Sequence, residues 1–306
     1  MENIAKEKFT IIGVDKNEAE RIARPRISYM ADAWRRFKEN KTALIAFFIL
    51  LVLAIMCVIG PKLSGYGFEE VDKTAKNAFP SSAHWFGTDK LGRDLFARVW
   101  EGGRISMIIG LAGAVVASVV GCIYGGIAAY FGGMVDTILM RIVEVLYSIP
   151  YLIIVILMSL VLDASGLFTL ILAMTATGWC GTARLVRGQM LQVKSMEYVM
   201  AAQSLGVAPM KIILKHMIPN TINVIIVSLT FAIPNYIFSE AFLSYLGLGI
   251  QPPDTSWGAL AYAGQAQFMF YPYQLVFPAT MIALTMLSFT LLGDGLRDAL
   301  DPKLRK

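Results

Sequence analysis

Long uncharged runs are the feature of this sequence that most limits what it can fold into. Four stretches of at least 18 residues contain no Asp, Glu, Lys or Arg, at 43–60, 105–131, 166–183 and 275–292. Two further apolar runs each hold one acid, Glu144 in 142–162 and Glu240 in 221–250. At about 1.5 Å per residue, an 18-residue helix nearly covers the hydrocarbon layer of a bilayer. The sequence therefore predicts six transmembrane segments.

The composition agrees with a protein that is solvated by lipid. Apolar residues make up 56% of the chain and charged residues only 16%, whereas soluble domains carry about a quarter charged residues. Backbone polar groups inside lipid must be satisfied within the structure itself, and the alternation of period two that marks barrel strands is absent. We therefore expect an all-α membrane protein.

The distribution of lysine and arginine predicts how the chain is oriented. If the charged segment before the first span is cytosolic, twenty of the 27 basic residues lie inside, and the seven outside all fall between Lys62 and Arg104. An excess of basic residues marks the cytosolic side. We thus expect a multi-pass membrane protein with both termini in the cytosol. The net charge of +5 reflects this bias and not nucleic-acid binding.

The predicted organisation separates a first span from five later spans by a long outer loop. The first span follows a long charged tail without a small-residue cleavage site, so we expect it to be an uncleaved span. The expected parts are a cytosolic tail (1–42), the first span (43–60), an outer loop (61–104), a five-helix core (105–293) that includes a cytosolic connection (187–220), and a cytosolic C-terminal tail (294–306).

The chain carries few residues that could perform chemistry. His84 and His216 fall on opposite sides of the membrane in this topology, so they cannot share a metal ion. Cys57, Cys122 and Cys180 each lie in an apolar run, where an isolated thiol acts as a small buried apolar group. The G-x-x-x-x-G-K-[ST] loop that cradles phosphates is absent. We expect no metal site and no enzyme activity, so energy for any transport comes from a partner or an ion gradient.

The second span predicts close helix packing. Small residues recur at every fourth position in two stripes, one of Gly110, Ala114, Ser118, Cys122 and Gly126, the other of Ala117, Gly121, Gly125 and Ala129. Small side chains let helices approach closely inside lipid, so this span should be surrounded by other helices. Pro150, Pro234 and Pro278 should kink three other spans.

The connection at 187–220 predicts two short helices. Ser195 can cap the first, Glu197 lies in its first turn, and Gly206 can end it in the left-handed conformation. Pro209 can open the second and Pro219 end it. An apolar stripe of Met210, Ile213, Leu214 and Met217 should lie against the membrane or the spans, with Lys211 and Lys215 facing away. Glu197, Ala201 and Ser204 share a face of low bulk that a partner protein could approach, although a solvated linker would show the same pattern.

These residues carry a resemblance to a known family. Residues 197–206 (EYVMAAQSLG), followed by 212–220 (IILKHMIPN), resemble the EAA loop of permease subunits in bacterial binding-protein-dependent ABC importers. The segments 87–94 (GTDKLGRD), 102–106 (GGRIS), 240–249 (EAFLSYLGLG) and 293–302 (GDGLRDALDP) resemble the dipeptide, oligopeptide and nickel group of these permeases. The similarity runs from about Trp34 to Lys306. It is strongest to the second oligopeptide permease subunit, with small departures at Ala97 and Gly103.

The resemblance implies a location in the bacterial inner (plasma) membrane, a role and a set of partners. The five later spans would form the five-helix core of the family, with the first span at its periphery. The permease would pair with a second, similar permease, two cytosolic ATPases would bind ATP and Mg²⁺ below it, and an extracytoplasmic binding protein would deliver oligopeptides to the path between the permeases. No cofactor is expected in this chain. The EAA motif implies a coupling helix that contacts an ATPase, and the matching residues are Glu197, Tyr198, Ala201, Ala202, Ser204, Leu205, Gly206 and Pro209.

Other functions remain open at this point. Dipeptides or nickel are alternative substrates within the same group. An ion-coupled secondary transporter would use membrane carboxylates. Glu240 and Glu144 are the candidates for the translocation path, although Arg141 lies one turn from Glu144 and predicts a local ion pair. A scaffold without transport activity is a third possibility, but it does not account for the EAA motif.

Overall fold

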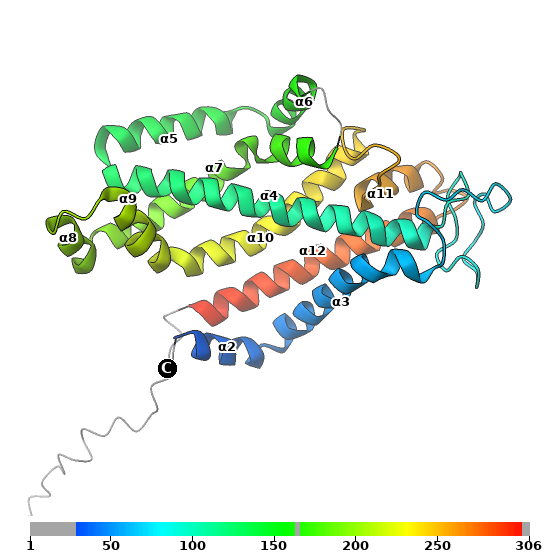
Figure 1. The fold of residues 1–306 in the computed structure, drawn as a ribbon, viewed down its shortest axis with the longest axis horizontal. Coiled ribbons are helices and arrows are strands. Elements are labelled where there is room, and N and C mark those ends of the chain that lie inside the picture. Colours follow the sequence, from blue (N-terminus) through cyan, green and yellow to red (C-terminus); the bar gives the residue numbers. More distant parts are fainter. Residues whose placement is uncertain (1–28, 163–165, 302–306) are drawn as a thin grey trace, which may run out of the picture.

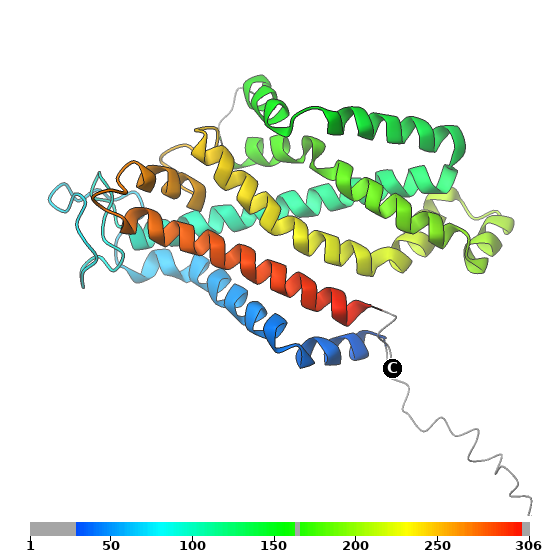
Figure 2. The same cartoon turned by 180° about the vertical axis from the view of Figure 1, so that it is seen from behind.

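The protein is an elongated bundle of helices in a computed structural model that describes residues 29–162 and 166–301 (Figures 1 and 2). The described residues form no strand; one isolated bridge joins Thr88 and Asp94. The elements in chain order are α2 (Tyr29–Glu39), α3 (Lys41–Leu63), α4 (Leu95–Phe131), α5 (Gly133–Ser148), α6 (Tyr151–Val161), α7 (Leu167–Lys194), α8 (Glu197–Ser204), α9 (Pro209–Ile212), the π-helix η2 (Ile213–Met217), α10 (Ile218–Tyr245), α11 (Trp257–Gln265) and α12 (Tyr273–Leu300). Most of the predicted tail at 1–42 and residues 302–306 lie outside the described residues.

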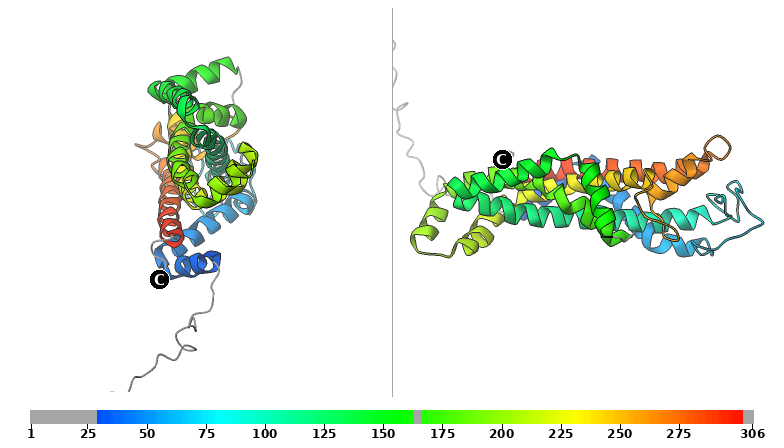
Figure 3. Two further views of the ribbon diagram at one scale, coloured as in Figure 1. Left: turned by 90° about the vertical axis from the view of Figure 1, so that its left-hand side faces the viewer. Right: turned by 90° about the horizontal axis from the view of Figure 1, so that it is seen from above.

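The bundle has two different ends (Figures 1 and 3). The α8 end carries α8 and α9, and the opposite α11 end carries α11 and the connection 64–94. The described chain ends, α2 and the last turn of α12, lie side by side toward the α8 end, where the guanidinium of Arg36 donates to the carbonyl oxygen of Asp301 (3.2 Å). The long helices therefore alternate in direction between the two ends.

The helices confirm an all-α membrane protein but not the number of spans. Within the described residues, four helices are long and apolar enough to cross a bilayer: α3, α4, the continuous helix Pro209–Tyr245, and α12. The bent pair α5 and α6 raises the number to five if it counts as one span. The predicted fourth span lies in α7, but from Thr175 onward α7 carries Thr, Gly, Trp and Arg residues, which lower its hydropathy. Six spans therefore stay a prediction.

The third predicted span, 142–162, is not a straight helix. α5 ends at Ser148 and α6 begins at Tyr151, and the two helices meet at 86°. Pro150 at the junction lacks the N–H of a continuous helix, and the residue before a proline is driven to extended backbone; Ile149 has ψ 129°. The expected kink at Pro150 is thus a complete break, whereas Pro234 and Pro278 lie inside α10 and α12, which continue through them.

Small residues place α4 at the centre of the bundle, as expected. All nine residues of the two predicted stripes are buried. A Cβ added at Gly121 would lie 2.7 Å from Cβ of Thr182 on α7, so the glycine is needed for the two helices to meet. α4 packs more extensively on α7 than any other pair of described elements does, and it also contacts α3, α10, α11 and α12.

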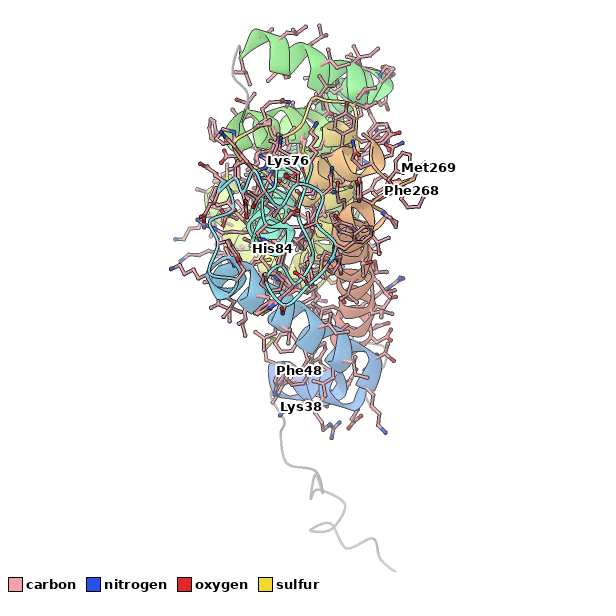
Figure 4. The ribbon with its side chains drawn as sticks, turned by 90° about the vertical axis from the view of Figure 1, so that its right-hand side faces the viewer. Lys38, Phe48, Lys76, His84, Phe268 and Met269 are labelled. Atoms are coloured by element: carbon pink, nitrogen blue, oxygen red, sulfur yellow. The ribbon has the colours of Figure 1, made fainter. Side chains whose placement is uncertain are left out.

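The start of α4 lies within the predicted outer loop. α4 begins at Leu95, ten residues before the predicted span, and the connection between α3 and α4 is 64–94, so the predicted loop 61–104 also contains the ends of both helices. Its location outside the membrane stays a prediction. Asp94 caps the helix by accepting from the N–H of Ala97 (2.9 Å), and the His84 ring hydrogen-bonds the same carboxylate (2.9 Å). Figure 4, which looks onto the α11 end, shows His84 within this connection. The first turns of α4 are helical because Leu95, Phe96, Val99 and Trp100 pack on α3, α11 and α12.

A short helix in the N-terminal segment was not predicted. α2 buries Ala33 and Phe37 against α12 and α3, while Arg35 and Arg36 pair with Asp32 at 2.7 and 2.5 Å. α2 was missed from the sequence because the segment is highly charged, which obscured the spacing of four residues between Ala33 and Phe37. α2 and α3 lie at one edge of the bundle, below α12 in Figure 1.

Candidate functional site

The predicted coupling helix is α8, which closes one end of the bundle. Val199 and Ala202 face inward, with exposed fractions of 0% and 7%, and pack on Met190 of α7 and on Ile212, Ile213 and Met217. Glu197, Tyr198, Ala201, Ser204 and Leu205 point away from this apolar seat and are exposed. The structure thus divides the candidate coupling residues into an outer face and an inner one.

Ala202 belongs to the inner face. The sequence interpretation placed Ala202 against a partner, but its methyl group instead contacts this chain's own core. A small side chain at this position lets α8 pack closely on the core. Ala202 therefore holds the helix in place and is not part of the surface that a partner would contact. Ala201, its neighbour, has the exposed position.

Hydrogen bonds define where α8 begins and ends. Gly206 has φ +72°, as predicted, and its N–H donates to the carbonyl of Gln203 (3.0 Å), while the N–H of Val207 donates to Ala202 (3.1 Å). This pair of bonds is the Schellman arrangement that satisfies the last carbonyls of a helix. The predicted cap by Ser195 is wrong: its hydroxyl donates to the carbonyl of Gln192 at the end of α7 (2.9 Å), and Met196 precedes α8 without a side-chain cap.

The second predicted helix does not stop at Pro219. Pro209 opens α9 as expected, but α9, η2 and α10 form one helix, Pro209–Tyr245. A proline collides with the carbonyl four residues back in a regular α-helix. Here the preceding turn is a π-helix, in which the N–H of Ile218 donates to the carbonyl of Ile213, five residues back.

The π turn also shifts the predicted apolar stripe. Ile213 and Met217 are buried as expected, but Ile212 takes a third buried place, and Met210 and Leu214 are half-exposed at 47% and 50%. Because a π turn holds one more residue than an α turn, positions that follow it no longer match a period of 3.6. Lys211 and Lys215 face away, as predicted.

Glu240 lies at the opposite end of α10 and is completely buried. Its carboxylate accepts hydrogen bonds from the hydroxyls of Ser106 on α4 (2.9 Å), Ser244 on α10 (2.7 Å) and Ser256 at the start of α11 (2.6 Å). We call these four residues the Glu240 cluster. The N–H of Trp257 donates to Ser106 Oγ (3.1 Å) and that of Ala259 to Ser256 Oγ (3.0 Å). The cluster joins three helices, and its burial argues against direct contact between Glu240 and a substrate.

Glu144 lies on the exposed side of α5. Its carboxylate pairs with Arg141 at 2.8 Å, which is the local ion pair that the sequence predicted, and both side chains are more than half exposed. Nothing in this geometry brings Glu144 near Glu240. The role of either acid in a translocation path therefore stays a prediction.

The described residues hold no group of three His, Cys, Asp or Glu side chains that could bind a metal ion. Cys57, Cys122 and Cys180 are buried free thiols in three different places. The His84 ring is hydrogen-bonded to Asp94, and His216 lies in η2 at the α8 end.

The sequence interpretation missed a polar groove on α7 and α10. Side-chain amides line it, namely Gln189, Gln192, Asn220, Asn223 and Asn235. Two of these amides, Asn223 and Asn235, lie inside a predicted span, and an uncharged amide in a span was the available signal.

Comparison with known proteins gives the family. Residues 117–306 match the binding-protein-dependent transport system inner membrane component family, and residues 28–80 match the N-terminal TM domain of oligopeptide transport permease C. The chain is 50% identical to the dipeptide transport system permease protein DppC of Bacillus subtilis (99% of this chain, 95% of that one) and 46% identical to the oligopeptide transport system permease protein OppC of the same organism (100% of both).

More distant similarities agree. The glutathione transport system permease protein GsiD of Escherichia coli is 40% identical over 89% of this chain and 90% of its own. A chain of the methionine ABC transporter MetNI in an inward-facing conformation has the same fold, with a TM-score of 0.53 and 18% identity over 68% of this chain and 96% of that one. The chain thus belongs to the inner-membrane permease family of binding-protein-dependent ABC importers, in its peptide-transporting group.

Proposed function

We propose that this chain forms half of the translocation pore of an ATP-driven oligopeptide importer. The observation that carries the proposal is the exposed face of α8, which presents Glu197, Tyr198, Ala201, Ser204 and Leu205 beyond the bundle. Leu205 is 82% exposed, and an apolar side chain so exposed at the tip of a helix is suited to a pocket in a partner.

The proposed partners are a second permease, two cytosolic ATPases and an extracytoplasmic binding protein. The ATPases bind ATP and Mg²⁺, and one of them seats α8. The binding protein docks at the α11 end, where Met269 and Phe270 are 87% and 76% exposed and Phe268 and Met269 project outward (Figure 4). This chain holds no cofactor of its own and performs no hydrolysis.

The continuity of the helix beyond α8 supports a way to transmit motion. α8 is fixed to α9, η2 and α7 by buried apolar contacts, and α9 runs without a break into α10. A displacement of α8 by an ATPase would thus move the α8 end of α10 with it. Packed helices pass on such shifts because close-packed interfaces do not deform continuously.

The deciding experiment is reconstitution of the chain with its partner permease, ATPases and binding protein in vesicles. We expect peptide uptake that requires ATP and peptide-stimulated ATP hydrolysis. Comparison of alanine peptides from two to five residues long separates dipeptide from oligopeptide transport, and we expect uptake beyond dipeptides. Uptake that persists without the ATPases but needs an ion gradient would contradict the proposal.

The proposed orientation places the α8 end in the cytosol. Ser82, Ala263 and Ser204 are exposed, the first two at the α11 end and the third on α8. Cysteines at positions 82 and 263 should react with a membrane-impermeant reagent from outside intact cells, and a cysteine at 204 should react only after permeabilisation. Labelling of position 204 in intact cells would reverse the orientation.

A further inference from the structure

Besides the exposed face of α8, the chain has a second distinctive feature, the polar groove on α7 and α10. It has a volume of about 930 Å³ and lies between α7, α10 and α12 toward the α8 end. Its polar lining on α7 and α10 is Gln189, Gln192, Asn220, Asn223, Ser228 and Asn235. A second cavity of about 250 Å³ shares Ala232 and Asn235 with it and extends it along α10 to Tyr236 and Ser239. The two cavities together follow one face of α10.

The polar side chains that line the groove on α7 and α10 are uncharged, and the rest of its lining on these helices is apolar: Leu185, Val224, Val227, Phe231 and Ala232. Its charged residues, Arg297 and Asp301, belong to the end of α12 and lie at its mouth. An Asn or Gln amide offers both donors and an acceptor, and so does each peptide unit of a main chain. Asn220 and Asn235 each donate one N–H to the carbonyl four residues back in their own helix, at 2.6 and 3.0 Å, and an amide has a second N–H and an oxygen.

A buried hydroxyl without a hydrogen-bond partner belongs to Tyr236, which lines the smaller cavity. Tyr236 is 8% exposed, and its Oη has no hydrogen-bond partner among the described residues. Gly178 of α7 lies directly opposite, where a Cβ would collide with this oxygen. Burying a hydroxyl without a partner costs free energy, and a small rotation of the Tyr236 side chain into the adjoining cavity would let a ligand there supply the hydrogen bond.

We propose that this groove is the chain's contribution to the inner half of the translocation path and that it binds the main chain of the peptide. The inference rests on the proposed function. Asn220 and Asn235 are 15 residues apart, about 22 Å along the helix, which matches about six or seven residues of extended peptide. Because these amides hydrogen-bond the main chain of the peptide and not its side chains, we expect peptides with acidic, neutral and basic side chains to be transported equally well.

The test measures ATP-driven uptake of three heptapeptides by the reconstituted complex: seven alanines, and the same peptide with Glu or with Lys at its fourth position. The variant Asn220→Leu/Asn235→Leu keeps the branching and the number of heavy atoms of both side chains and removes the amides. We expect uptake of all three peptides to fall about tenfold and by the same factor, as the loss of two ordinary hydrogen bonds predicts. Thr290→Val is the matched control, because Thr290 is exposed on α12 outside the groove and also bonds a carbonyl four residues back.

Tyr236→Phe gives an independent readout. Removing an unpaired buried hydroxyl should leave thermal stability unchanged or raise it. We expect uptake to fall about threefold while the melting temperature does not fall, a combination that a structural role of the hydroxyl would not produce. Unchanged uptake in this variant would exclude the smaller cavity from the path.

The remaining outcomes distinguish a failure of main-chain binding in the groove from a failure of the proposed function. Unchanged uptake in the double asparagine variant, or a loss that differs between the Glu and Lys peptides, would overturn main-chain binding while leaving the proposed function in place. Loss of copurification with the second permease would show that the groove is a subunit interface. If the wild-type complex imports none of the three peptides, the proposed function fails and takes this inference with it.

Discussion

The two ends of α10 are held in opposite ways. At the α11 end, the Glu240 cluster joins α10 to α4 and α11 through three hydroxyl hydrogen bonds to one carboxylate. At the α8 end, the contacts that seat α8 on the described part of the chain are apolar, and its other side is exposed. Directional hydrogen bonds specify one arrangement, whereas apolar contact depends mainly on buried area.

The difference suggests that the two ends of α10 have different roles. A helix that is fixed by hydrogen bonds at one end and by apolar contacts at the other can rotate about the hydrogen-bonded end. The proposed groove, with Asn220 and Asn235, lies between these ends. The following predictions, from the largest expected effect to the smallest, test whether the α11 end is the fixed point and the α8 end the movable one.

Glu240→Leu should have the largest effect. It leaves three buried hydroxyls without their acceptor, and each buried polar group left unsatisfied costs about 1–3 kcal/mol. We expect a loss of several kcal/mol in the free energy of unfolding, seen as a lower melting temperature of the purified complex and poor assembly. Glu240→Gln keeps an acceptor oxygen and should be milder. Normal assembly of Glu240→Leu would show that the cluster is not the fixed point.

Ala201→Trp and Ala202→Trp form a matched pair of adjacent substitutions on α8. Ala202 is buried, so tryptophan there should overpack the seat and cost about 1–3 kcal/mol in stability. Ala201 is exposed, so tryptophan there should leave stability unchanged but prevent ATPase binding. Copurification of the ATPases and the melting temperature distinguish the two. Equal effects of both variants on both measurements would contradict the two-faced assignment of α8.

Gly206→Val tests the turn that ends α8. The left-handed φ of +72° is strongly disfavoured for a β-branched residue and costs about 1–2 kcal/mol. No atom would obstruct the new side chain, so the effect is one of backbone strain alone. We expect reduced peptide-stimulated ATP hydrolysis with membrane insertion intact, and Gly206→Asn should retain most activity because asparagine tolerates this conformation. A stronger defect in Gly206→Asn than in Gly206→Val would rule out strain as the cause.

Glu197→Ala should have the smallest effect. The carboxylate is exposed in the first turn of α8, where an acid stabilises a helix by about 0.3–1 kcal/mol. We expect a small decrease in ATPase affinity, measured by titration of the ATPase, and almost no change in melting temperature. A loss of uptake as large as that of Ala201→Trp would mean that Glu197 makes a specific ionic contact with the ATPase.

The periodic features of the sequence predicted the helices well. The four uncharged runs lie within α3, α4, α7 and α12, except that Gly166 directly precedes α7, and both small-residue stripes of α4 are buried. These predictions succeed because hydropathy and side-chain size act within one helix. Gly206 and Pro209 were predicted correctly for the same reason, since the backbone conformation that each favours is local.

The features that failed depend on distant parts of the chain. Nothing near Glu240 in sequence reveals that Ser106, 134 residues away, shares its carboxylate. Ala201 and Ala202 are equivalent as residue types, and only the position of the core behind α8 decides which one is buried. The π turn before Pro219 adds one residue to the helix register, and periodicity that assumes 3.6 residues per turn cannot detect it.

The length of α4 has a consequence for how the protein fits its bilayer. Its 37 residues extend about 55 Å, whereas the hydrocarbon layer is about 30 Å thick. Trp100 and Trp257, near the beginning of α4 and in α11, pack in a core made by the protein. This end of α4 is covered by protein and not by lipid, so a thicker or thinner membrane changes only how much of the middle of α4 is immersed. The arrangement of the α11 end is therefore expected to be insensitive to the acyl-chain length of the surrounding lipids.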